Sequence, residues 1–443
     1  MASTVEIVRK ETIKPSSPTS PHSKNFKFSL LDQLMPCPYA PLVLFYPSGD
    51  GLDTVGKVNL LKSSLSKILT HFYMLAGKMK DDLSIDCNDE GAYFVEARLN
   101  ISLNDFLCRP DLLQIHKFLP CEVVLKGPIE GTFVSNFQVT VFECGGLAIG
   151  LCISHKVLDG HALGTFLKAW CSSMASEAEN LMVPDFSAYS LFPSDDDLWL
   201  RDSTNVMWGS LFKPGKCITK RFLFNASSIA KLKAQATLKS RITRVEAVSA
   251  FLWRCTITAS KNRHGFHRPS LITHLVNLRR RIVSSSLYEK SIGNLLWIAS
   301  AKCNSEHEPE LYHLMNEVKG AISKVDYKLT DRLRGNERKS MVTESFKELT
   351  ILDGTDYLSC TSWCKLGFYE ADFGWGKPIW VSSYGIGGTM VMNFVILNDT
   401  SCGEGIEAWI TLDEQDMSFL QQDPELVSLT SIDPSPLHLT EHP

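Results

Sequence analysis

The sequence has little net charge and no long apolar run. Its 45 lysines and arginines nearly balance 49 aspartates and glutamates, which leaves a formal charge of -4. This balance argues against a nucleic-acid backbone or an anionic membrane as the main partner. No apolar run reaches the roughly 18–20 residues that span a bilayer, and residues 1–24 lack the apolar core of a signal peptide. We expect a soluble, cytoplasmic protein that binds neither nucleic acid nor membrane.

Sequence motifs for several common chemistries are absent as well. No Gly-x-Gly-x-x-Gly follows a predicted strand, and no Gly-Lys pair is followed by Ser or Thr. These absences argue against the usual dinucleotide and P-loop phosphate sites. The sequence also has no Gly-x-Ser-x-Gly of a serine hydrolase and no His-Glu-x-x-His of a zinc peptidase.

Cysteine spacing gives no sign of a disulfide framework or a metal site. The 13 cysteines are odd in number and are scattered from Cys37 to Cys402 without paired spacing, which predicts reduced thiols. Cys360-x-x-x-Cys364 and His264-x-x-His267 are isolated pairs, whereas structural zinc needs four ligands. We therefore expect no metal.

What the sequence does contain is a mixture of strand and helix patterns. Phe133–Glu143 is rich in β-branched and aromatic residues, and Leu147–Ile153 alternates apolar side chains after a Gly-Gly turn, which predicts a hairpin. From Ala162 the apolar residues follow one helical face. Lys27–Asp32 and Thr219–Phe224 are also predicted to be strands.

A segment without periodicity separates two halves of the chain. Residues 181–215 contain Pro184, Pro193 and Pro214 and an acidic run at 195–197, as a crossing linker would. The sequence therefore predicts an N-terminal α/β domain over 1–180, a crossover linker over 181–215 and a C-terminal α/β domain over 216–443. Mixed β-sheets are favoured because hairpins and helices both occur.

The sequence His155-Lys-Val-Leu-Asp159-Gly160 stands between the predicted hairpin and the following helix. A histidine on such a turn can project into a cavity and act as a general base, and a carboxylate four residues later can hold the loop. Two plainer interpretations stay open at this point. The histidine can be a hydrogen-bonded core residue, and Asp159 can simply cap the helix.

A second distinctive stretch is Asp372-Phe373-Gly374-Trp375-Gly376, followed by Lys-Pro. Two glycines around a tryptophan, with a proline soon after, describe a tight and rigid loop. Taken alone, this stretch favours a turn at a sheet edge that has no part in function.

Together, in this order, the two motifs resemble those of the plant BAHD acyltransferases, which carry His-x-x-x-Asp-Gly in mid-chain and Asp-Phe-Gly-Trp-Gly near the C-terminus. The resemblance extends over nearly the whole chain, from residues 14–19 through 30–34, 65–78 and 246–254 to Asn277-Leu-Arg279. It departs at Met74, where the family usually has Pro, and at residues 291–294, where many members have an aromatic pair. Residues 31–34, 87–89 and 361–364 look most like the vinorine synthase-like branch of alkaloid acetyltransferases.

This resemblance implies a fold of two similar chloramphenicol acetyltransferase-like domains with an active-site channel between them. It implies that His155 is the general base and that Asp159 supports the histidine loop through a pair with Arg279. The loop 372–376 would shape the channel wall, with Trp375 as a contact for the developing oxyanion. No Ser or Cys shows a local signature of activation, which favours direct transfer without an acyl-enzyme.

The resemblance also implies acyl-CoA as co-substrate, with no tightly bound cofactor. Thr243-x-x-Glu246 has capping-box spacing, and family members use the positions of Thr243 and Arg244 near the CoA nucleotide, although an ordinary helix cap with solvated arginines is the alternative. We expect a monomeric enzyme that transfers acetyl from acetyl-CoA to a hydroxyl of a plant specialised metabolite, an alkaloid by resemblance. The alternatives are a malonyl or aromatic acyl donor and a terpenoid, phenolic or sugar acceptor. A non-catalytic binding protein and a hydrolase are the rival classes.

Overall fold

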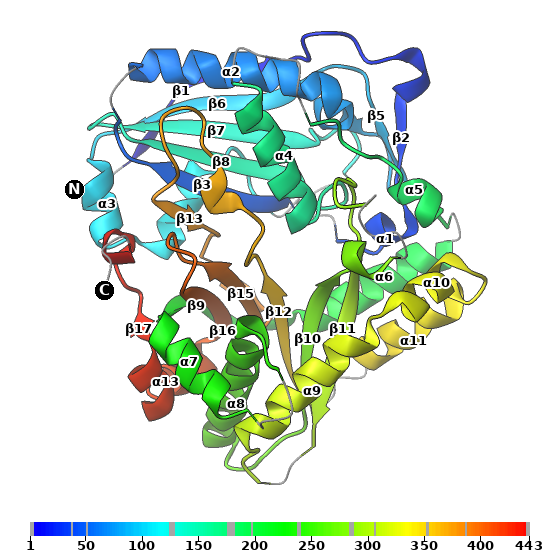
Figure 1. Ribbon diagram of the computed structural model, residues 1–443, viewed down its shortest axis with the longest axis vertical. Helices are drawn as coiled ribbons and strands as arrows, with labels where there is room; N and C mark the ends of the chain where they lie inside the picture. The colour runs from blue at the N-terminus through cyan, green and yellow to red at the C-terminus, as the bar shows by residue number, and fades with distance from the viewer. Residues whose placement is uncertain are drawn as a thin grey trace.

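The computed structural model describes residues 4–36, 39–49, 52–123, 129–174, 182–195, 198–236, 241–282, 288–304, 307–350, 354–385 and 388–439. These residues form two large mixed β-sheets and one small sheet, with helices on the outer faces (Figure 1). The predicted α/β class with mixed sheets is confirmed.

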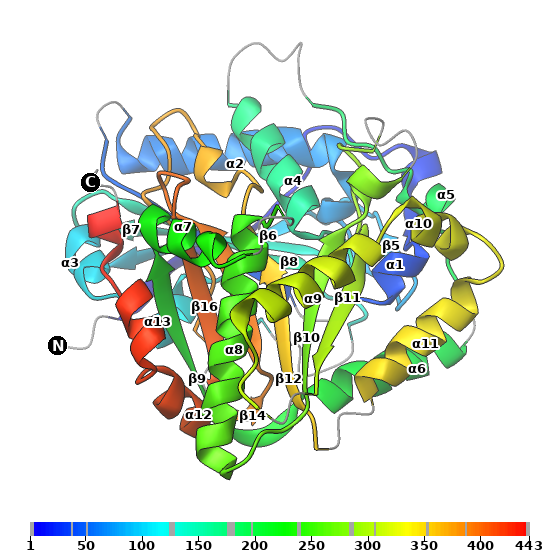
Figure 2. The same cartoon turned by 60° about the horizontal axis from the view of Figure 1, so that its bottom comes forward.

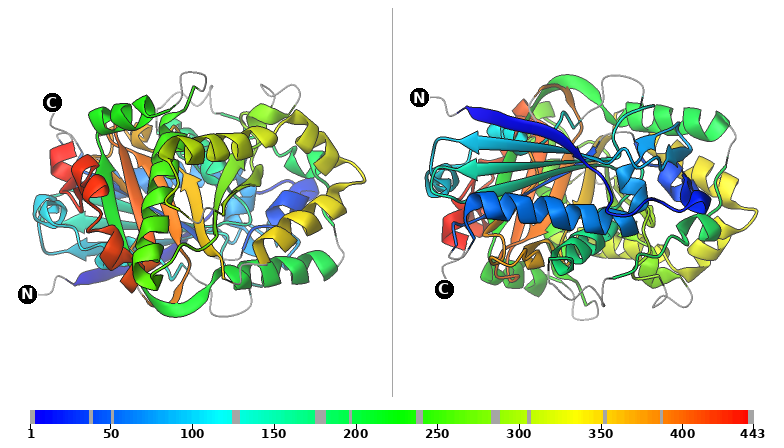
Figure 3. Two further views of the ribbon diagram at one scale, coloured as in Figure 1. Left: turned by 90° about the horizontal axis from the view of Figure 1, so that it is seen from below. Right: turned by 90° about the horizontal axis from the view of Figure 1, so that it is seen from above.

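The first large sheet has six strands and is covered on one side by two helices. Its strands in spatial order are β1 (Val5–Ile13), β6 (Ala92–Leu99), β7 (Ser135–Phe142), β8 (Leu147–Ser154), β3 (Tyr39–Tyr46) and β13 (Trp380–Ser382). The pair β6–β7 is parallel and the other pairs are antiparallel. Helices α2 (Thr54–His71) and α4 (Gly160–Ser172) lie over the sheet, and Figure 3 shows α2 running along it.

The second large sheet has eight strands, and its outer face is covered by α8 (Arg244–His264) and α9 (Leu311–Lys324) (Figure 2). Its strands in order are β11 (Leu296–Cys303), β10 (Ser270–Asn277), β12 (Asp356–Ser362), β15 (Phe394–Asp399), β16 (Ile406–Asp413), β9 (Lys213–Phe224) and β14 (Gly388–Val391), with β17 (Ser431–Ile432) also on β9. The pairs β10–β12 and β12–β15 are parallel.

The remaining elements are short strands and peripheral helices. The small sheet consists of β2 (Asn25–Lys27), β5 (Ser84–Asp86) and β4 (Lys78–Met79). The other helices are α1 (Leu30–Gln33), α3 (Leu103–Cys108), α5 (Ala188–Leu191), α6 (Leu198–Leu211), α7 (Ala226–Ala234), α10 (Tyr327–Arg334), α11 (Arg338–Thr350), α12 (Glu414–Leu420) and α13 (Pro424–Leu429).

A layer of aromatic side chains joins the two large sheets. Trp380, on the edge strand β13 of the first sheet, stacks on Phe45 of β3 and on Trp409 of β16 in the second sheet. The buried carboxylate of Glu407 pairs with Arg221 and accepts the indole N–H of Trp409 at 2.9 Å. This ion pair lies within the second sheet, and it reaches the first sheet through Trp380, whose indole N–H donates to Glu407 at 3.4 Å and whose ring lies under the Arg221 guanidinium.

The boundaries that we predicted from the sequence do not coincide with the elements and sheets of the structure. The segment 181–215 contains α6, and β9 already begins at Lys213. Strand β13 comes from the second half of the chain but completes the first sheet. The division into 1–180, 181–215 and 216–443 therefore stays a prediction about domains, while the second half of the chain contributes strand β13 to the first sheet.

Candidate active site

The proposed catalytic histidine lies at the end of a central, fully buried strand. Strand β8 is flanked by β7 and β3 and ends at Ser154, and His155 opens the turn that leads to α4. Gly150 lets the chain at Phe118 lie against β8, because a Cβ at this position would be only 1.9 Å from the Phe118 carbonyl oxygen. The turn leaves His155 half-buried, between the sheet and the start of the helix.

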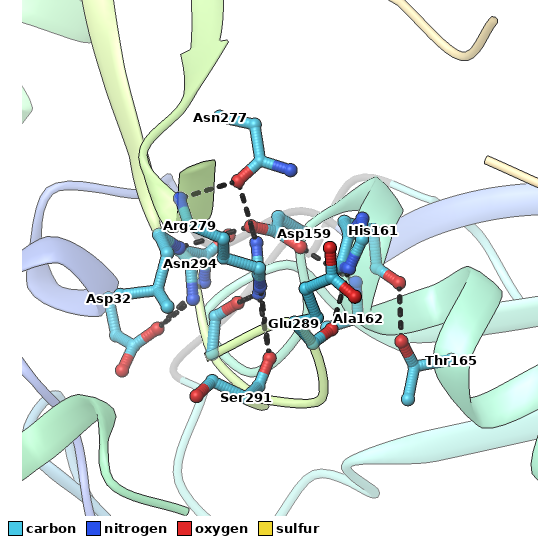
Figure 4. A network of polar contacts seen from close by, with 12 residues as sticks. Asp32, Asp159, His161, Ala162, Thr165, Asn277, Arg279, Glu289, Ser291 and Asn294 are labelled. Carbon is cyan, nitrogen blue, oxygen red and sulfur yellow. Dashed lines mark hydrogen bonds and ion pairs between the residues drawn. The ribbon is translucent and has the colours of Figure 1, made fainter. Parts of the chain in front are cut away.

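Asp159 makes two kinds of contact at once. Its Oδ1 accepts the backbone N–H of Ala162 at 2.8 Å, which caps α4. Its Oδ2 accepts Nη1 of Arg279 at 2.7 Å and the backbone N–H of Leu295 at 3.0 Å (Figure 4). Both oxygens of the Asp159 carboxylate therefore hold the loop. Asp159 makes both the helix cap and the ion pair that were expected.

Arg279 is the partner of Asp159 from the second half of the chain, and both side chains are fully buried. Its guanidinium also donates to the carbonyl oxygens of Ser291 and Gly293 and to Oδ1 of Asn277 (Figure 4). Every one of these partners belongs to β10 or to the segment before β11. The histidine loop is therefore bound to the second sheet by charge-assisted hydrogen bonds.

Asn294 determines which nitrogen of the neutral His155 ring carries the hydrogen. The amide Nδ2 of Asn294 donates to the His155 carbonyl at 2.7 Å and to Oδ1 of Asp32 at 2.9 Å. This orientation leaves Oδ1 of Asn294 facing Nδ1 of His155, 3.2 Å away. An amide oxygen can only accept, so Nδ1 carries the hydrogen in the neutral ring. Nε2 then has the free electron pair that a general base requires.

Asp32 supports this arrangement from α1. Its Oδ1 also accepts the backbone N–H of Asn294, and its Oδ2 accepts the backbone N–H and the hydroxyl of Ser29. Burial raises the pKa of the Asp32 carboxyl, and the hydrogen bonds from Ser29 and Asn294 act in the opposite direction. Asn294 is thus held on both sides, by Asp32 and by His155.

The loop around Asp372 is built by one carboxylate and two glycines. Oδ1 of Asp372 accepts the backbone N–H groups of Gly374 and Gly376 at 2.8 and 3.0 Å. Both glycines have positive φ, 94° and 102°, a conformation that other residues adopt with strain. Phe373 is fully buried and packs against Trp170 of α4. The loop is therefore rigid and docks on the helical side of the first sheet.

Trp375 packs into the same region. Its ring stacks on Phe373, lies edge-on to Tyr46 and has Nζ of Lys57 5.7 Å from its centre. Its indole Nε1 is buried and has no hydrogen-bond partner in the part of the chain that the structure describes. These contacts do not bring Trp375 to His155, so its expected contact with the oxyanion has no geometric support.

Thr243 and Arg244 stand at the N-terminal end of α8. Thr243 caps the helix in a capping box with Glu246, as the spacing predicts. The guanidinium of Arg244 donates to the carbonyl oxygens of Gly403 and Glu404 and pairs with Asp399 at 2.9 Å. Arg244 therefore already binds the turn between β15 and β16, and any CoA phosphate would share it with that turn.

Sequence reasoning missed Asn294 and Asp32 as members of the site. Asp32 lies within a stretch that matches the family and Asn294 within one where the resemblance departs, and neither was given a role. The spacing Ser29-x-x-Asp32 is a signal for the capping box that the structure shows. The contact between Asn294 and His155 joins segments far apart in the chain, and no local pattern reveals it.

No group of three or more potential metal ligands is found among the described residues. No helix in the described part of the chain is long and apolar enough to cross a membrane.

The fold and this site define a class, the two-domain acyltransferases with a histidine loop between two mixed sheets. The model of the Transferase family matches residues 3–427 of the chain. The chain therefore belongs to this family, the BAHD acyltransferases, as the two motifs predicted.

The relatives that the chain resembles are acyltransferases over their whole length. It is 42% identical to an epi-neemfruitin B 7-O-acetyltransferase of Melia azedarach, covering 98% of this chain and 99% of the relative. A limonoid 7-O-acetyltransferase of Citrus sinensis is 39% identical with the same coverage. The crystal structure of vinorine synthase superposes with a TM-score of 0.83 at 33% identity, covering 97% of this chain and 99% of that one. This protein is an acyltransferase, and acyl-CoA is the co-substrate of its family.

Proposed function

We propose that this acyltransferase transfers acetyl from acetyl-CoA to a hydroxyl group of a bulky, polycyclic plant metabolite. The observation that carries the proposal is the pair His155–Asn294, in which the amide oxygen faces Nδ1, so that the hydrogen of the neutral ring is on Nδ1 and the free electron pair is on Nε2. A neutral imidazole is the group that an alcohol needs, because an alcohol is a poor nucleophile and a thioester carbonyl is already activated.

In the proposed mechanism, Nε2 of His155 takes the proton of the acceptor hydroxyl as its oxygen attacks the thioester carbonyl. The tetrahedral intermediate collapses by breaking the carbon–sulfur bond, and the departing CoA sulfur receives the proton from His155. No acyl-enzyme is formed. Asp159 does not orient the imidazole, because both its oxygens are engaged by Ala162, Arg279 and Leu295.

The acceptor is proposed from the substrates that the relatives' names give. The two relatives named above acetylate limonoids, whereas akuammiline synthase 2 of Alstonia scholaris, 36% identical, and salutaridinol 7-O-acetyltransferase of Papaver somniferum, 32% identical, carry alkaloid names. We therefore propose two acceptor classes, the expected alkaloid and a terpenoid alcohol. Acetyl is favoured over malonyl as donor because most of these names specify acetyl transfer.

The donor site is proposed at the N-terminal end of α8. Thr243 and Arg244 stand there with the positive end of the helix dipole, which favours phosphate groups. Asp372, Phe373, Gly374 and Gly376 are proposed to shape the loop beside the channel, and Trp375 to support that loop through its packing rather than to contact the oxyanion.

We further propose that the enzyme works as a monomer in the cytoplasm. The exposed edge strand β1 carries Glu6, Arg9 and Lys10, and its register with β6 shifts between Ile7 and Arg9. Charges and irregularities on an edge strand oppose pairing with another copy. Size-exclusion chromatography with light scattering tests this proposal.

The experiment that tests the function is incubation with acetyl-CoA, with and without a panel of polycyclic alcohols, followed by mass spectrometry. An acetyl ester supports the proposal. Free acetate formed alone would indicate a hydrolase, and no product with any alcohol would indicate a binding protein.

The matched test is the His155→Ala variant. We expect its acetyl transfer to fall by at least about 10²-fold, the low end of what a general base contributes. Its melting temperature should stay close to that of the parent protein, because the His155 side chain is half-buried and, among the described residues, is hydrogen-bonded to Asn294 alone. Near-normal turnover in this variant would contradict the mechanism.

A further inference from the structure

One face of the second sheet carries half-buried side chains in the middle of the molecule. They are Leu275 of β10, Leu296, Ile298 and Ser300 of β11, and Ser359 and Thr361 of β12, and we call them the acceptor wall. The strand pairing places all six on one face. Residues of the opposite face, such as Ala299 and Cys360, are buried in the core to which α8 and α9 also contribute. These two helices cover the outer face of the sheet (Figure 2). The partial exposure of the acceptor wall is therefore on the inner side, which faces the first sheet.

The acceptor wall begins next to the catalytic loop. Asn294, which contacts His155, lies two residues before Leu296, the first residue of β11 and of the wall. Side chains on one face of a strand follow one another at about 7 Å. Ile298 and Ser300 therefore lie successively farther from His155 along β11, at distances that a polycyclic molecule covers.

The chemistry of the acceptor wall changes with distance from His155. Leu296 is paired with Asn277, and the next row joins Ile298 to Leu275 of β10. The row after that contains hydroxyls, because Ser300 is paired with Thr273, which is paired in turn with Ser359 of β12. In this row Ser300 donates to Glu348, and the buried Thr273 hydroxyl is bonded to that of Tyr357. A bound molecule would thus meet apolar surface beside its reacting hydroxyl and neutral polar groups farther along the wall.

The acceptor wall has no carboxylate, and the carboxylates described around it already have partners. Asp32 accepts hydrogen bonds from Ser29 and Asn294. Glu348 of α11 accepts the Ser300 hydroxyl and pairs with Lys302 at the far end of β11. Asp32 and Glu348 therefore lie at the two ends of the wall, and no carboxylate belongs to its apolar row of Leu275 and Ile298.

From these observations we propose that the acceptor is an uncharged polycyclic alcohol of the terpenoid class, and that the acceptor wall selects against alkaloids that carry a protonated amine. The inference rests on the proposed function, since it assigns the alcohol side of that reaction. Moving an ammonium group from water to an apolar surface without a counter-charge is unfavourable, whereas burying the uncharged ether, ester and ketone oxygens of a terpenoid costs much less.

The first test compares two acceptors with the unmodified protein. The limonoid epi-neemfruitin B is uncharged, and salutaridinol has a basic tertiary amine that is protonated at pH 7. With saturating acetyl-CoA, we expect kcat/KM to be at least about tenfold higher for the limonoid, as a site without a counter-charge discriminates against a cation. A preference for salutaridinol overturns the proposal.

Binding is measured separately by calorimetry with CoA in place of acetyl-CoA. Tighter binding of the limonoid supports the acceptor wall even if no ester forms, and in that case only the proposed function fails. Tighter binding of salutaridinol, or binding of neither alcohol, overturns the inference.

The second test changes the charge of the wall at constant shape. Leu275→Asp introduces a carboxylate, and Leu275→Asn has nearly the same volume without charge. We expect the ratio of kcat/KM values, salutaridinol over limonoid, to be at least about tenfold higher in the Asp variant than in the Asn variant. If Leu275→Asp shows no melting transition, Thr361→Asp and Thr361→Asn provide the same comparison on β12. Equal ratios within a folded pair show that the wall does not contact the acceptor and overturn the proposal.

Discussion

A single amide, that of Asn294, determines which nitrogen of His155 is basic. Its Nδ2 is held by Asp32 and by the His155 carbonyl, so its oxygen remains fixed toward Nδ1. Removing this contact frees the ring to adopt either tautomer and other orientations. The proton-accepting nitrogen would then face the substrate for only part of the time.

We therefore expect Asn294→Ala to lower kcat at least about tenfold while the KM for acetyl-CoA stays unchanged, as when a catalytic imidazole loses its orienting partner. Steady-state kinetics with both substrates varied provide the measurement. Asn294→Asp is the control, since it keeps an acceptor for Nδ1 but places a second carboxylate against Asp32, which should lower the melting temperature. Unchanged kcat in the Ala variant would show that the amide does not orient the ring.

The buried pair of Asp159 and Arg279 belongs to stability rather than to proton transfer. Removing one member leaves the other charge buried without a partner, which costs about 3–5 kcal/mol in the free energy of unfolding. Asp159→Asn and Arg279→Ala should both lower soluble yield and melting temperature. Each should reduce turnover of the remaining folded protein less than His155→Ala does. A strong loss of turnover in Asp159→Asn with an unaltered melting profile would place Asp159 in the chemistry.

At the scale of helices and strands, the sequence predicted the elements that have a strong apolar periodicity. The hairpin is present as β7 and β8, and the helix after it as α4, because their apolar periodicity is strong. The strand predicted over Lys27–Asp32 is wrong beyond Lys27. There Ser29 and Asp32 form a capping box that starts the short helix α1, which the apolar run Leu30-Leu31 concealed.

Helix α6 was missed for a different reason. It occupies Leu198–Leu211 within the segment that was expected to link the domains, and prolines and an acidic run around it dominated the interpretation. The helix is held by partners far away in the chain, since Trp208 donates to the Leu34 carbonyl and Ser210 to that of Leu349. Tertiary contacts of this kind leave no mark in local sequence.

The N-terminal end of α8 allows a prediction about the donor. Arg244→Gln removes a charge that lies both at the helix end and on the turn after β15. We expect the KM for acetyl-CoA to rise severalfold and that for the alcohol to stay constant, with an effect that shrinks as salt screens the charge. Arg241→Gln is the matched control for a general loss of charge nearby. If the melting temperature falls but the KM for acetyl-CoA does not rise at low salt, Arg244 serves only the turn.

At the scale of the whole molecule, one buried histidine links stability to pH. His274 lies on β10, and its Nε2 has no hydrogen-bond partner in the part of the chain described. Burial lowers its pKa from 6.5 to about 4. Between these two pH values the unfolded chain binds a proton at His274 and the folded protein does not, so the free energy of unfolding decreases as pH falls.

The proton uptake by His274 should lower the free energy of unfolding by about 3 kcal/mol between pH 6.5 and pH 4. We expect His274→Leu to flatten the acid limb of the stability curve by that amount, measured by urea unfolding at several pH values. Substitution of the exposed His313 by Leu serves as the control and should leave the slope unchanged. An acid limb of the same steepness in His274→Leu would contradict the assignment.

The aromatic layer between the two sheets is also a property of the whole chain that the sequence did not predict. Its strand β13 pairs with β3 although the two lie at opposite ends of the sequence, and Trp380 supplies the contact to both Phe45 and Trp409. Only the closed fold brings these three rings together, so the site between the sheets could be predicted from family resemblance but not from periodicity.

Because β13 belongs to the first sheet, the first sheet cannot be completed early in synthesis. The ribosome synthesises a chain from its N-terminus, and a domain can complete its folding only when all its strands have emerged. The edge strand 380–382 is among the last parts to be translated. During most of synthesis the first sheet therefore lacks this strand, and the edge of β3 is unpaired. A nascent chain that stalls before residue 380 therefore exposes a β-strand edge to other chains, and molecular chaperones would be needed earliest at that edge.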